Sequence, residues 1–354
     1  MKILITGGAG FIGQHLARLL VTKGHEVTAM DSLDTQVHQN PEHSAERFPG
    51  VVLNRDVSES DAWESVPPHE AIVHLAAETG TSQSMYEQDH YRRVNVGGTQ
   101  LAATTAANWM VPIVTMSSRA VYGEGRLLEA GEVLPRGLDG GPSGRLLPSN
   151  EEDPHGPVSV YGETKSAGET ALERIVYGRV SATIIRPQNV IGQGQALHNP
   201  YTGVLAAFLA RLKEGRELSI YGDGSQTRDF VHVEDLAALV AWCLENPSAV
   251  GEPARVLNCG TGVRTSLDQL AQYAIDAAPG TDVGIVHTPI KRAGDIDHAC
   301  ADLRRLKEIG APLPAWSTKE AITQFIKTSW SSNGADSSAW DQALKELANK
   351  GLVE

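Results

Sequence analysis

The sequence predicts an α/β protein built around a parallel sheet with helices on both faces. Short apolar runs alternate with helical patterns in the first half, and a glycine-rich turn follows the first run. Because parallel strands are joined by crossovers that are usually helices, this alternation favours a parallel sheet. A smaller α/β region for substrate binding is expected after it.

Hydrophobic periodicity places the elements of the first half. Ile12, Leu16, Leu19 and Leu20 share one face of the first helix. Strands are expected at residues 2–6, 26–30, 51–53, 71–75, 112–117 and 180–186, and helices at 11–23, 85–108 and 161–177.

We expect residues 1–188 to form the first domain. A stretch at about 126–157, rich in Gly, Pro and charged residues, is interpreted as a surface insertion in it. Residues 189–354 are expected to form mainly a second domain, with some crossings of the chain back to the first. A separate short helix is expected at 339–352.

Composition excludes several classes of protein. The 43 acidic residues outnumber the 30 Lys and Arg, giving a net charge of -13 and no basic run that would suit nucleic acid. No run of about 18 apolar residues predicts a membrane span, and no leader pattern is present, so we expect a cytoplasmic protein. Cys243, Cys259 and Cys300 are scattered, and neither Cys nor His occurs at 126–154, so no disulfide framework or metal site is expected.

The first strand leads into a glycine motif. Gly7, Gly10 and Gly13 have the GxxGxxG spacing, and the helix begins at Phe11 and Ile12. Glycines permit a tight turn and a close approach of pyrophosphate to backbone N–H groups, and the helix dipole favours the anion. Glycine-rich turns are common, but the position between strand and helix indicates a Rossmann-type doubly wound sheet that binds a dinucleotide.

Asp31 follows the second strand and precedes Ser32, and both are expected to contact the cofactor. A carboxylate there accepts hydrogen bonds from both adenosine ribose hydroxyls and repels a 2′-phosphate. No Arg follows immediately. NAD is therefore favoured over NADP, although Asp31 could instead cap a turn or helix.

Tyr161 and Lys165 are spaced i and i+4 on a predicted helix, so they share one face. A nearby ammonium and the charge of nicotinamide lower the pKa of a phenol, which suits Tyr161 as a base. Lys165 is also expected to hold the nicotinamide ribose. Ser117 and Ser118, at the end of the fifth strand, supply a hydroxyl for the reacting oxygen. A lone Ser there could also be a turn or cap.

Together these motifs resemble the extended short-chain dehydrogenase/reductases, in the branch of NAD-dependent nucleotide-sugar epimerases and dehydratases typified by UDP-galactose 4-epimerase. The resemblance implies that Ser118 is the catalytic hydroxyl beside Tyr161 and Lys165, with Ser117 near the nicotinamide. Asn95 would steady the strand and helix at the site. The resemblance also implies that Leu75, Ala76 and Ala77 lie against the cofactor and that Asp56 and Val57 contact the adenine. The motifs further include His74-Leu75-Ala76-Ala77, Asn95-Val96-Gly97-Gly98-Thr99, Val121-Tyr122-Gly123 and Arg186-Pro187-Gln188-Asn189-Val190.

The second half adds substrate signals by the same resemblance. Arg228 would contact the phosphates or ribose of the nucleotide, and Arg292 would clamp the diphosphate. Two guanidinium groups on a diphosphate make charge-assisted hydrogen bonds, although each Arg could also form a surface ion pair. Further substrate contacts are expected from Thr79, Gln83, Ser118, Arg119, Asn189 and Asn199.

The positions after Ser118 distinguish the reactions of the branch. Its 4,6-dehydratases place Asp-Glu there, and its decarboxylases place Glu before Val-Tyr-Gly, whereas this chain has Arg119 and Ala120. The reaction that remains is oxidation and re-reduction at C4 of a nucleotide-diphosphate hexose, which is epimerisation. A 4-ketosugar reductase, an epimerase acting at another carbon, a 4,6-dehydratase or decarboxylase, and a non-catalytic NAD-binding regulator stay open as alternatives.

Three segments, at residues 118–125, 192–205 and 344–352, resemble the dTDP-L-rhamnose 4-epimerase group. The family further suggests a homodimer formed through the helices at 85–108 and 161–177. Neither the nucleotide base nor the sugar follows from the sequence.

Overall fold

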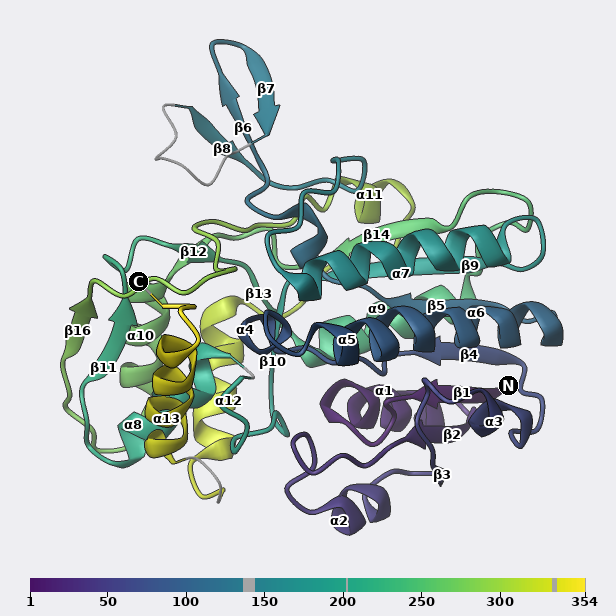
Figure 1. The fold of residues 1–354 in the computed structure, drawn as a ribbon, viewed down its shortest axis with the longest axis horizontal. Coiled ribbons are helices and arrows are strands. Elements are labelled where there is room, and N and C mark those ends of the chain that lie inside the picture. The colour runs from purple at the N-terminus through teal and green to yellow at the C-terminus, as the bar shows by residue number, and fades with distance from the viewer. Residues whose placement is uncertain (136–143, 202, 333–335, 354) are drawn as a thin grey trace.

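The computed structural model describes residues 1–135, 144–201, 203–332 and 336–353 (Figure 1). Its largest sheet has seven strands in the order β14-β9-β5-β4-β1-β2-β3, all parallel, which confirms the predicted Rossmann-type α/β fold. The strands are β1 (Lys2–Thr6), β2 (Glu26–Asp31), β3 (Val51–Asn54), β4 (Ala71–His74), β5 (Ile113–Met116), β9 (Ala182–Pro187) and β14 (Arg255–Cys259).

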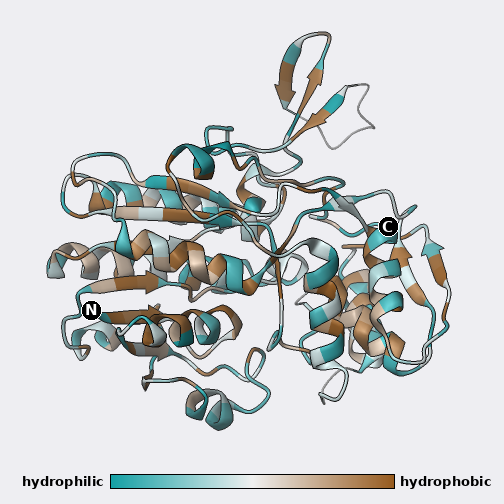
Figure 2. Cartoon of the chain, turned by 180° about the vertical axis from the view of Figure 1, so that it is seen from behind, coloured by the Kyte–Doolittle hydropathy of each residue, from teal (hydrophilic) through white to brown (hydrophobic). Residues whose placement is uncertain are grey.

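Helices cover both faces of this sheet, as alternation along the strands requires. Ile3 and Ile5 of β1 join the core on one face, and Leu4 joins the core on the other. In Figure 2 the strands of the sheet are mostly hydrophobic, and the helices carry hydrophilic stretches. The first face is covered by α1 (Phe11–Thr22) and α9 (Val233–Glu245), and the second by α3 (Ser60–Glu64), α6 (Gly98–Trp109) and α7 (Val160–Val176).

Most predicted bounds of the first half lie within two residues of the observed ones. The helix expected at 85–108 is the exception, and that prediction was wrong at its start. The chain instead forms α4 (Thr81–Ser84), α5 (Gln88–Tyr91), a π-helical segment η1 (Arg92–Gly97) and then α6. Asn95 lies in η1 and is held by the Glu78 backbone, so the helix widens where a side chain is fixed.

Residues after 188 contribute to both lobes. β14 and α9 complete the large sheet, while the second lobe packs around its own apolar core, which includes Phe208, Leu270 and Phe325. The division at residue 188 stays a prediction. The second lobe contains α8 (Val204–Lys213), α10 (Leu267–Ala277), α12 (Thr318–Ser329), α13 (Ser337–Asn349), β10 (Asn189–Ile191), β11 (Leu218–Tyr221), β12 (Thr227–Arg228), β13 (Phe230–His232), β15 (Thr265–Ser266) and β16 (Ile285–Thr288).

The predicted insertion carries a small antiparallel sheet that projects from the body of the molecule (Figure 1). Its strands are β6 (Arg126–Glu129), β7 (Glu132–Pro135) and β8 (Arg145–Leu147), and the part at residues 136–143 lies outside the described residues. Two short helices, α2 (Pro41–Glu46) and α11 (Arg304–Glu308), complete the list, together with the 3₁₀ turn η2 (Arg119–Tyr122). Within the described ranges, no helix has the length and apolar character needed to cross a membrane.

Candidate active site

The turn between β1 and α1 is shaped by its glycines. Gly7 has a φ of +66°, which glycine adopts without strain. A Cβ at Gly7 would lie 2.8 Å from the Ala76 backbone nitrogen, and a Cβ at Gly13 would lie 2.4 Å from the Gly8 carbonyl oxygen. The turn, the end of β4 and α1 therefore approach one another as closely as a dinucleotide site requires.

The start of α1 is free to bind an anion. Phe11 and Ile12 form its first turn, and among the described residues no side chain caps it at Gly10. The first N–H groups of a helix have no partner inside the helix, and they attract phosphate. The backbone at Phe11 and Ile12 thus fits the pyrophosphate of a dinucleotide.

Asp31 ends β2 with its carboxylate buried behind this turn. It accepts the N–H groups of Ala9 and Leu33, each at 3.0 Å. His38 Nε2 lies 3.2 Å from one carboxylate oxygen, a partner that the sequence analysis did not single out. The neighbouring Ser32 is exposed. An acidic group in this place fits the hydroxyls of an adenosine ribose.

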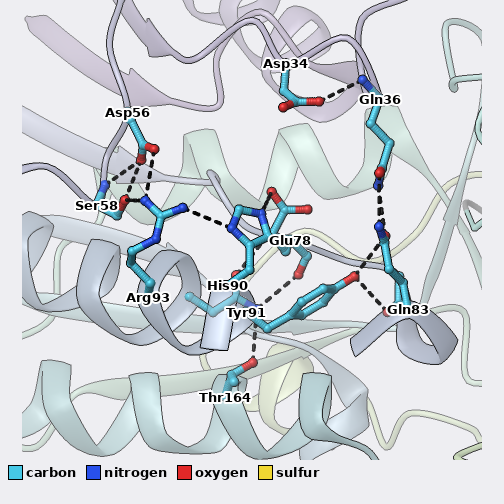
Figure 3. A network of polar contacts seen from close by, with 12 residues as sticks. Asp34, Gln36, Asp56, Ser58, Glu78, Gln83, His90, Tyr91, Arg93 and Thr164 are labelled. Atoms are coloured by element: carbon cyan, nitrogen blue, oxygen red, sulfur yellow. Dashed lines mark hydrogen bonds and ion pairs between the residues drawn. The ribbon is translucent and has the colours of Figure 1, made fainter. Parts of the chain in front are cut away.

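The expected adenine end lies beyond β3, in the network of Figure 3. The Asp56 carboxylate accepts the Ser58 N–H at 2.8 Å and the Ser58 hydroxyl at 2.7 Å, and Arg93 lies 3.5 Å away. Burial alone would raise the pKa of Asp56, but these groups together lower it. Val57 is buried, and its side chain packs against Gly98. These contacts hold the Asp56 carboxylate beside the Arg93 guanidinium group.

The segment after β4 is fixed to β1. The Leu75 N–H donates to the Thr6 carbonyl oxygen at 3.1 Å, and the Ala76 N–H lies 3.3 Å from the Thr6 hydroxyl oxygen. Ala77 follows, half-buried. Leu75 and Ala76 lie beside Gly7, where the resemblance expects this segment to flank the cofactor.

Asn95 ties this segment to α7, the helix that carries Tyr161 and Lys165. Its amide oxygen accepts the Glu78 N–H at 2.8 Å, and its NH₂ group donates to the Glu78 carbonyl and to the Thr164 hydroxyl, both at 3.0 Å. The Glu78 carboxylate pairs with His90 at 3.1 Å, and burial raises its pKa (Figure 3). Asn95 therefore steadies the residues around the site.

Tyr161 stands at the start of α7 with its phenol facing Ser118. Its backbone N–H donates to the Ser84 hydroxyl at 3.0 Å, which joins α7 to α4. Burial raises the pKa of Tyr161, whereas the hydrogen bond from Ser118 and the charge of Arg119 lower it. Burial has the larger effect, so the pKa of Tyr161 is raised rather than lowered, and Arg119, not the Lys165 expected from the sequence, is the cation that lowers it.

Lys165 lies one turn further along α7, buried. Its ammonium donates to the Met116 carbonyl oxygen at 2.9 Å. Burial lowers the pKa of Lys165 to about 8, although the Glu169 carboxylate raises it. The ammonium is thus held at the carboxyl end of β5, beside Ser117 and Ser118.

Ser117 points into a buried polar cluster behind these groups. Its hydroxyl donates to Glu169, whose carboxylate is also paired with Arg186 at 2.9 Å and 2.6 Å. Arg186 donates in addition to the Tyr122 hydroxyl at 2.9 Å and to His155 Nε2 at 2.7 Å. The predicted contact of Ser117 with the cofactor stays a prediction, because its hydroxyl is engaged here.

The predicted diphosphate cations come from the second lobe. Arg228 donates to three backbone carbonyls, of Thr227 and of the 296–297 segment, at 2.6–3.0 Å. Arg292 pairs with Asp295 at 2.9 Å and lies over the Tyr221 ring, 5.3 Å from its centre. The charge of Arg292 lowers the pKa of Arg228, and the charge of Arg228 lowers the pKa of Arg119. The three guanidinium groups therefore lie in one region.

Arg119 extends this positive region toward Tyr161. It donates to the Gly123 carbonyl oxygen, and burial together with the charge of Arg228 lowers its pKa to about 10. The Glu124 carboxylate interacts electrostatically with both Arg119 and Arg228, and it accepts the Asp297 N–H at 2.9 Å. A guanidinium group, not an acid, therefore stands next to Ser118.

The remaining predicted substrate residues differ in accessibility. Gln83 is buried, and its amide exchanges two hydrogen bonds with Gln36, at 2.9 Å and 3.0 Å (Figure 3). Asn199 is buried and accepts the Tyr201 N–H at 2.9 Å. Asn189 begins β10, half-buried, and Thr79 is exposed. The structure thus gives Gln83 a role in joining α4 to the loop after β2.

Comparison with known proteins now decides the family. Residues 3–260 match the model of the NAD dependent epimerase/dehydratase family. The chain belongs to this family. NAD is therefore its cofactor, as predicted, and the residues described above fit it.

Individual relatives differ in reaction. The chain is 36% identical over 349 residues to dTDP-L-rhamnose 4-epimerase of Burkholderia thailandensis, covering 92% of this chain and 93% of the relative. It is also 27% identical over 340 residues to UDP-N-acetyl-alpha-D-glucosaminuronate decarboxylase of Bacillus cytotoxicus, covering 92% and 97%. A solved UDP-glucose 4-epimerase with UDP-glucose from Thermotoga maritima superimposes with a TM-score of 0.79 at 26% identity, covering 93% and 98%.

The sequence analysis missed several residues that the site uses. Glu169 accepts the Ser117 hydroxyl, His38 pairs with Asp31, and Gln36 binds the Gln83 amide. The spacing of Glu169, four residues after Lys165, could have revealed it, since both then share a helix face. Among the described residues, no group of three His, Cys, Asp or Glu side chains could hold a metal ion.

Proposed function

We propose that this protein inverts C4 of a nucleotide-diphosphate hexose, as an NAD-dependent 4-epimerase. The observation that carries the proposal is the neighbourhood of Ser118 and Tyr161. Elimination and decarboxylation in this family use an acid directly after the catalytic hydroxyl, and here Arg119 and Ala120 occupy those positions. A pair built from Tyr161 and Ser118 handles one hydroxyl proton, which suffices for chemistry at a single carbon.

Tyr161 acts as the base in this account. Its phenolate oxygen takes the proton of the C4 hydroxyl as the C4–H bond breaks, and it returns the proton when that bond forms again on the opposite face. Ser118 hydrogen-bonds the reacting oxygen, and the positive charge of Arg119 favours the ionised phenol. NAD, when bound, supplies the acceptor and donor of hydride.

The residues for the cofactor follow the edge of the large sheet. Gly7, Gly10, Gly13 and the start of α1 would hold the pyrophosphate, and Asp31 would hold the adenosine ribose. Asp56, Val57 and the segment at 75–77 would flank the adenine and the middle of the molecule. Lys165 would reach the nicotinamide ribose from the other side.

The nucleotide sugar would lie between this edge and the second lobe. Arg228 and Arg292 would bind its diphosphate, because planar guanidinium groups make two parallel hydrogen bonds to phosphate oxygens. The similarity to a dTDP-L-rhamnose 4-epimerase supports a dTDP-linked 6-deoxyhexose as the first substrate to test. We also propose a homodimer that forms through α6 and α7, which lie side by side on one face (Figure 1).

The test is product analysis by NMR with dTDP-L-rhamnose, UDP-glucose and UDP-glucuronate, each with and without added NADH. The proposal expects a C4 epimer without net consumption of cofactor. The second candidate, a 4-ketosugar reductase, would require stoichiometric NADH. A pentose or a stable ketone would contradict the epimerase assignment.

A further inference from the structure

The last helix is anchored on the second lobe at its start. The Ser337 backbone N–H donates to Glu214 at 2.9 Å, and Asp341 pairs with Arg211 at 2.9 Å and with Arg216 at 3.3 Å. These contacts fix one end of α13 to α8 and the residues that follow it. The other end of α13 leads into the C-terminal segment of the chain, whose end is marked C in Figure 1.

Beyond this helix the chain pairs with the loop that carries Arg292. The Ala293 N–H donates to the Leu352 carbonyl oxygen at 2.9 Å, and Val353 lies opposite Arg292 in an antiparallel bridge. A Cβ at Gly294 would lie 3.3 Å from Ser159 Cβ, the residue that caps α7. The Arg292 loop is therefore held between the last residues of the chain and the catalytic helix.

The end of α13 also reaches the first lobe. Glu346 lies 3.3 Å from the Tyr201 hydroxyl, which lies 3.0 Å from the Tyr86 hydroxyl. The Lys350 ammonium stands over the Tyr86 ring, 3.8 Å from its centre, a distance suited to a cation–π contact. Tyr86 follows α4, whose Ser84 accepts the Tyr161 N–H.

We infer that residues 346–353 form a strap that positions Arg292 and so determines the affinity for the nucleotide diphosphate. The strap contacts three separate parts of the chain, at the Arg292 loop, at Tyr201 and at Tyr86. An arginine on a short loop loses conformational freedom when it binds phosphate, and a loop already held loses less. The inference rests on the proposed role of Arg292 and adds the part of the chain that makes Arg292 effective.

A chain that ends at Gly351 tests the strap, since it lacks the Leu352 carbonyl and Val353. We expect its affinity for dTDP and UDP, measured by calorimetry, to fall about tenfold relative to the full chain, with NAD affinity unchanged. Lys350→Met should weaken the same binding by a smaller factor. Lys345→Met, on the exposed face of α13, is the matched control and should bind normally.

A double-variant cycle identifies the path of the effect. If the strap acts through Arg292, Arg292→Ala weakens nucleotide binding in the full chain, and it adds little in the shortened chain. Three results would each overturn the inference. The losses of nucleotide affinity caused by Arg292→Ala and by shortening could simply add, the shortened chain could bind with unchanged affinity, or the full-length Arg292→Ala variant could bind normally. Nucleotide binding does not depend on which sugar reaction occurs, so a failed epimerisation assay would leave this result standing.

Discussion

The cofactor side and the substrate side of the site are built differently. On the cofactor side, most residues lie at the carboxyl ends of strands of one parallel sheet, as Asp31 ends β2 and Ser118 follows β5. On the substrate side, Arg228 and Arg292 stand on short segments that distant parts of the chain hold in place. The comparison teaches that strand ends position the residues for the cofactor and the reaction, while short segments held by distant contacts position the residues proposed to bind the substrate.

Substitution of the base should have the largest effect. Tyr161→Phe keeps the ring but removes the oxygen that takes the proton, so we expect turnover to fall by a factor of about 10² or more. Bound NAD and the thermal midpoint should stay close to the parent values. Tyr177→Phe, an exposed tyrosine at the end of the same helix, serves as the control. A variant that turns over normally would remove Tyr161 from the mechanism.

The substrate side should respond separately from the cofactor side. Arg292→Ala and Arg228→Ala each remove a charge-assisted contact of roughly 1.5–3 kcal/mol, so nucleotide-sugar binding should weaken by roughly 10- to 100-fold. NAD affinity should not change. Arg304→Ala, an exposed arginine, is the control. Variants that bind substrate normally but unfold easily would show that these arginines only support the structure.

Asp31 tests the cofactor side in the same way. We expect titration to show tighter binding of NAD(H) than of NADP(H), because the buried carboxylate would repel a 2′-phosphate. Asp31→Ala should weaken NAD(H) binding without unfolding the chain. Equal or tighter binding of NADP(H) by the parent protein would contradict this assignment, and it would direct attention to His38, which pairs with the carboxylate.

The buried His74 should make the stability of the folded chain depend on pH. Its ring is buried between the Thr6 and Thr99 hydroxyls, at 2.8 Å and 3.2 Å, and burial with the nearby Lys165 charge lowers its pKa to about 3. The unfolded chain then binds the proton more readily, so stability falls as pH drops from about 6.5 toward 3. The fall is about 1.4 kcal/mol per pH unit.

Urea unfolding between pH 5 and 7 measures this contribution. His74→Gln should remove that part of the slope, whereas His43→Gln, which changes an exposed ring, should keep it. Equal slopes for His74→Gln and the parent protein would show that His74 binds its proton equally well in the folded and unfolded chain.

The sequence predicted the sheet and the cofactor edge well because their signals are local. Strand periodicity and the glycine turn depend on neighbouring residues, and the observed bounds lie close to the predicted ones. The helix expected to begin at Met85 begins instead at Gln88, after the separate turn of α4, and it is π-helical at Arg92–Gly97, where Asn95 contacts Glu78. Periodicity does not report such a contact.

Long-range partners limited the prediction of the site for the same reason. The contact of Ser117 with the cofactor stays a prediction, and the sequence did not reveal that Glu169 accepts its hydroxyl. The contact of Gln83 with the substrate likewise stays a prediction, and the sequence did not reveal that Gln36 binds its amide. In each case the residue lies where the sequence analysis expected it along the chain, and a partner from another element decides where its polar group points.

The most direct test of the central claim follows the C4 hydrogen through the reaction. The nucleotide sugar that the protein turns over is prepared with deuterium at C4, and the unlabelled sugar is run in deuterated water. The account predicts inversion at C4 with the substrate label retained there, and no solvent deuterium at C3, C4 or C5. Loss of the C4 label, or solvent deuterium at C3 or C5, would show that a proton is removed from carbon, and the 4-epimerase account would be wrong.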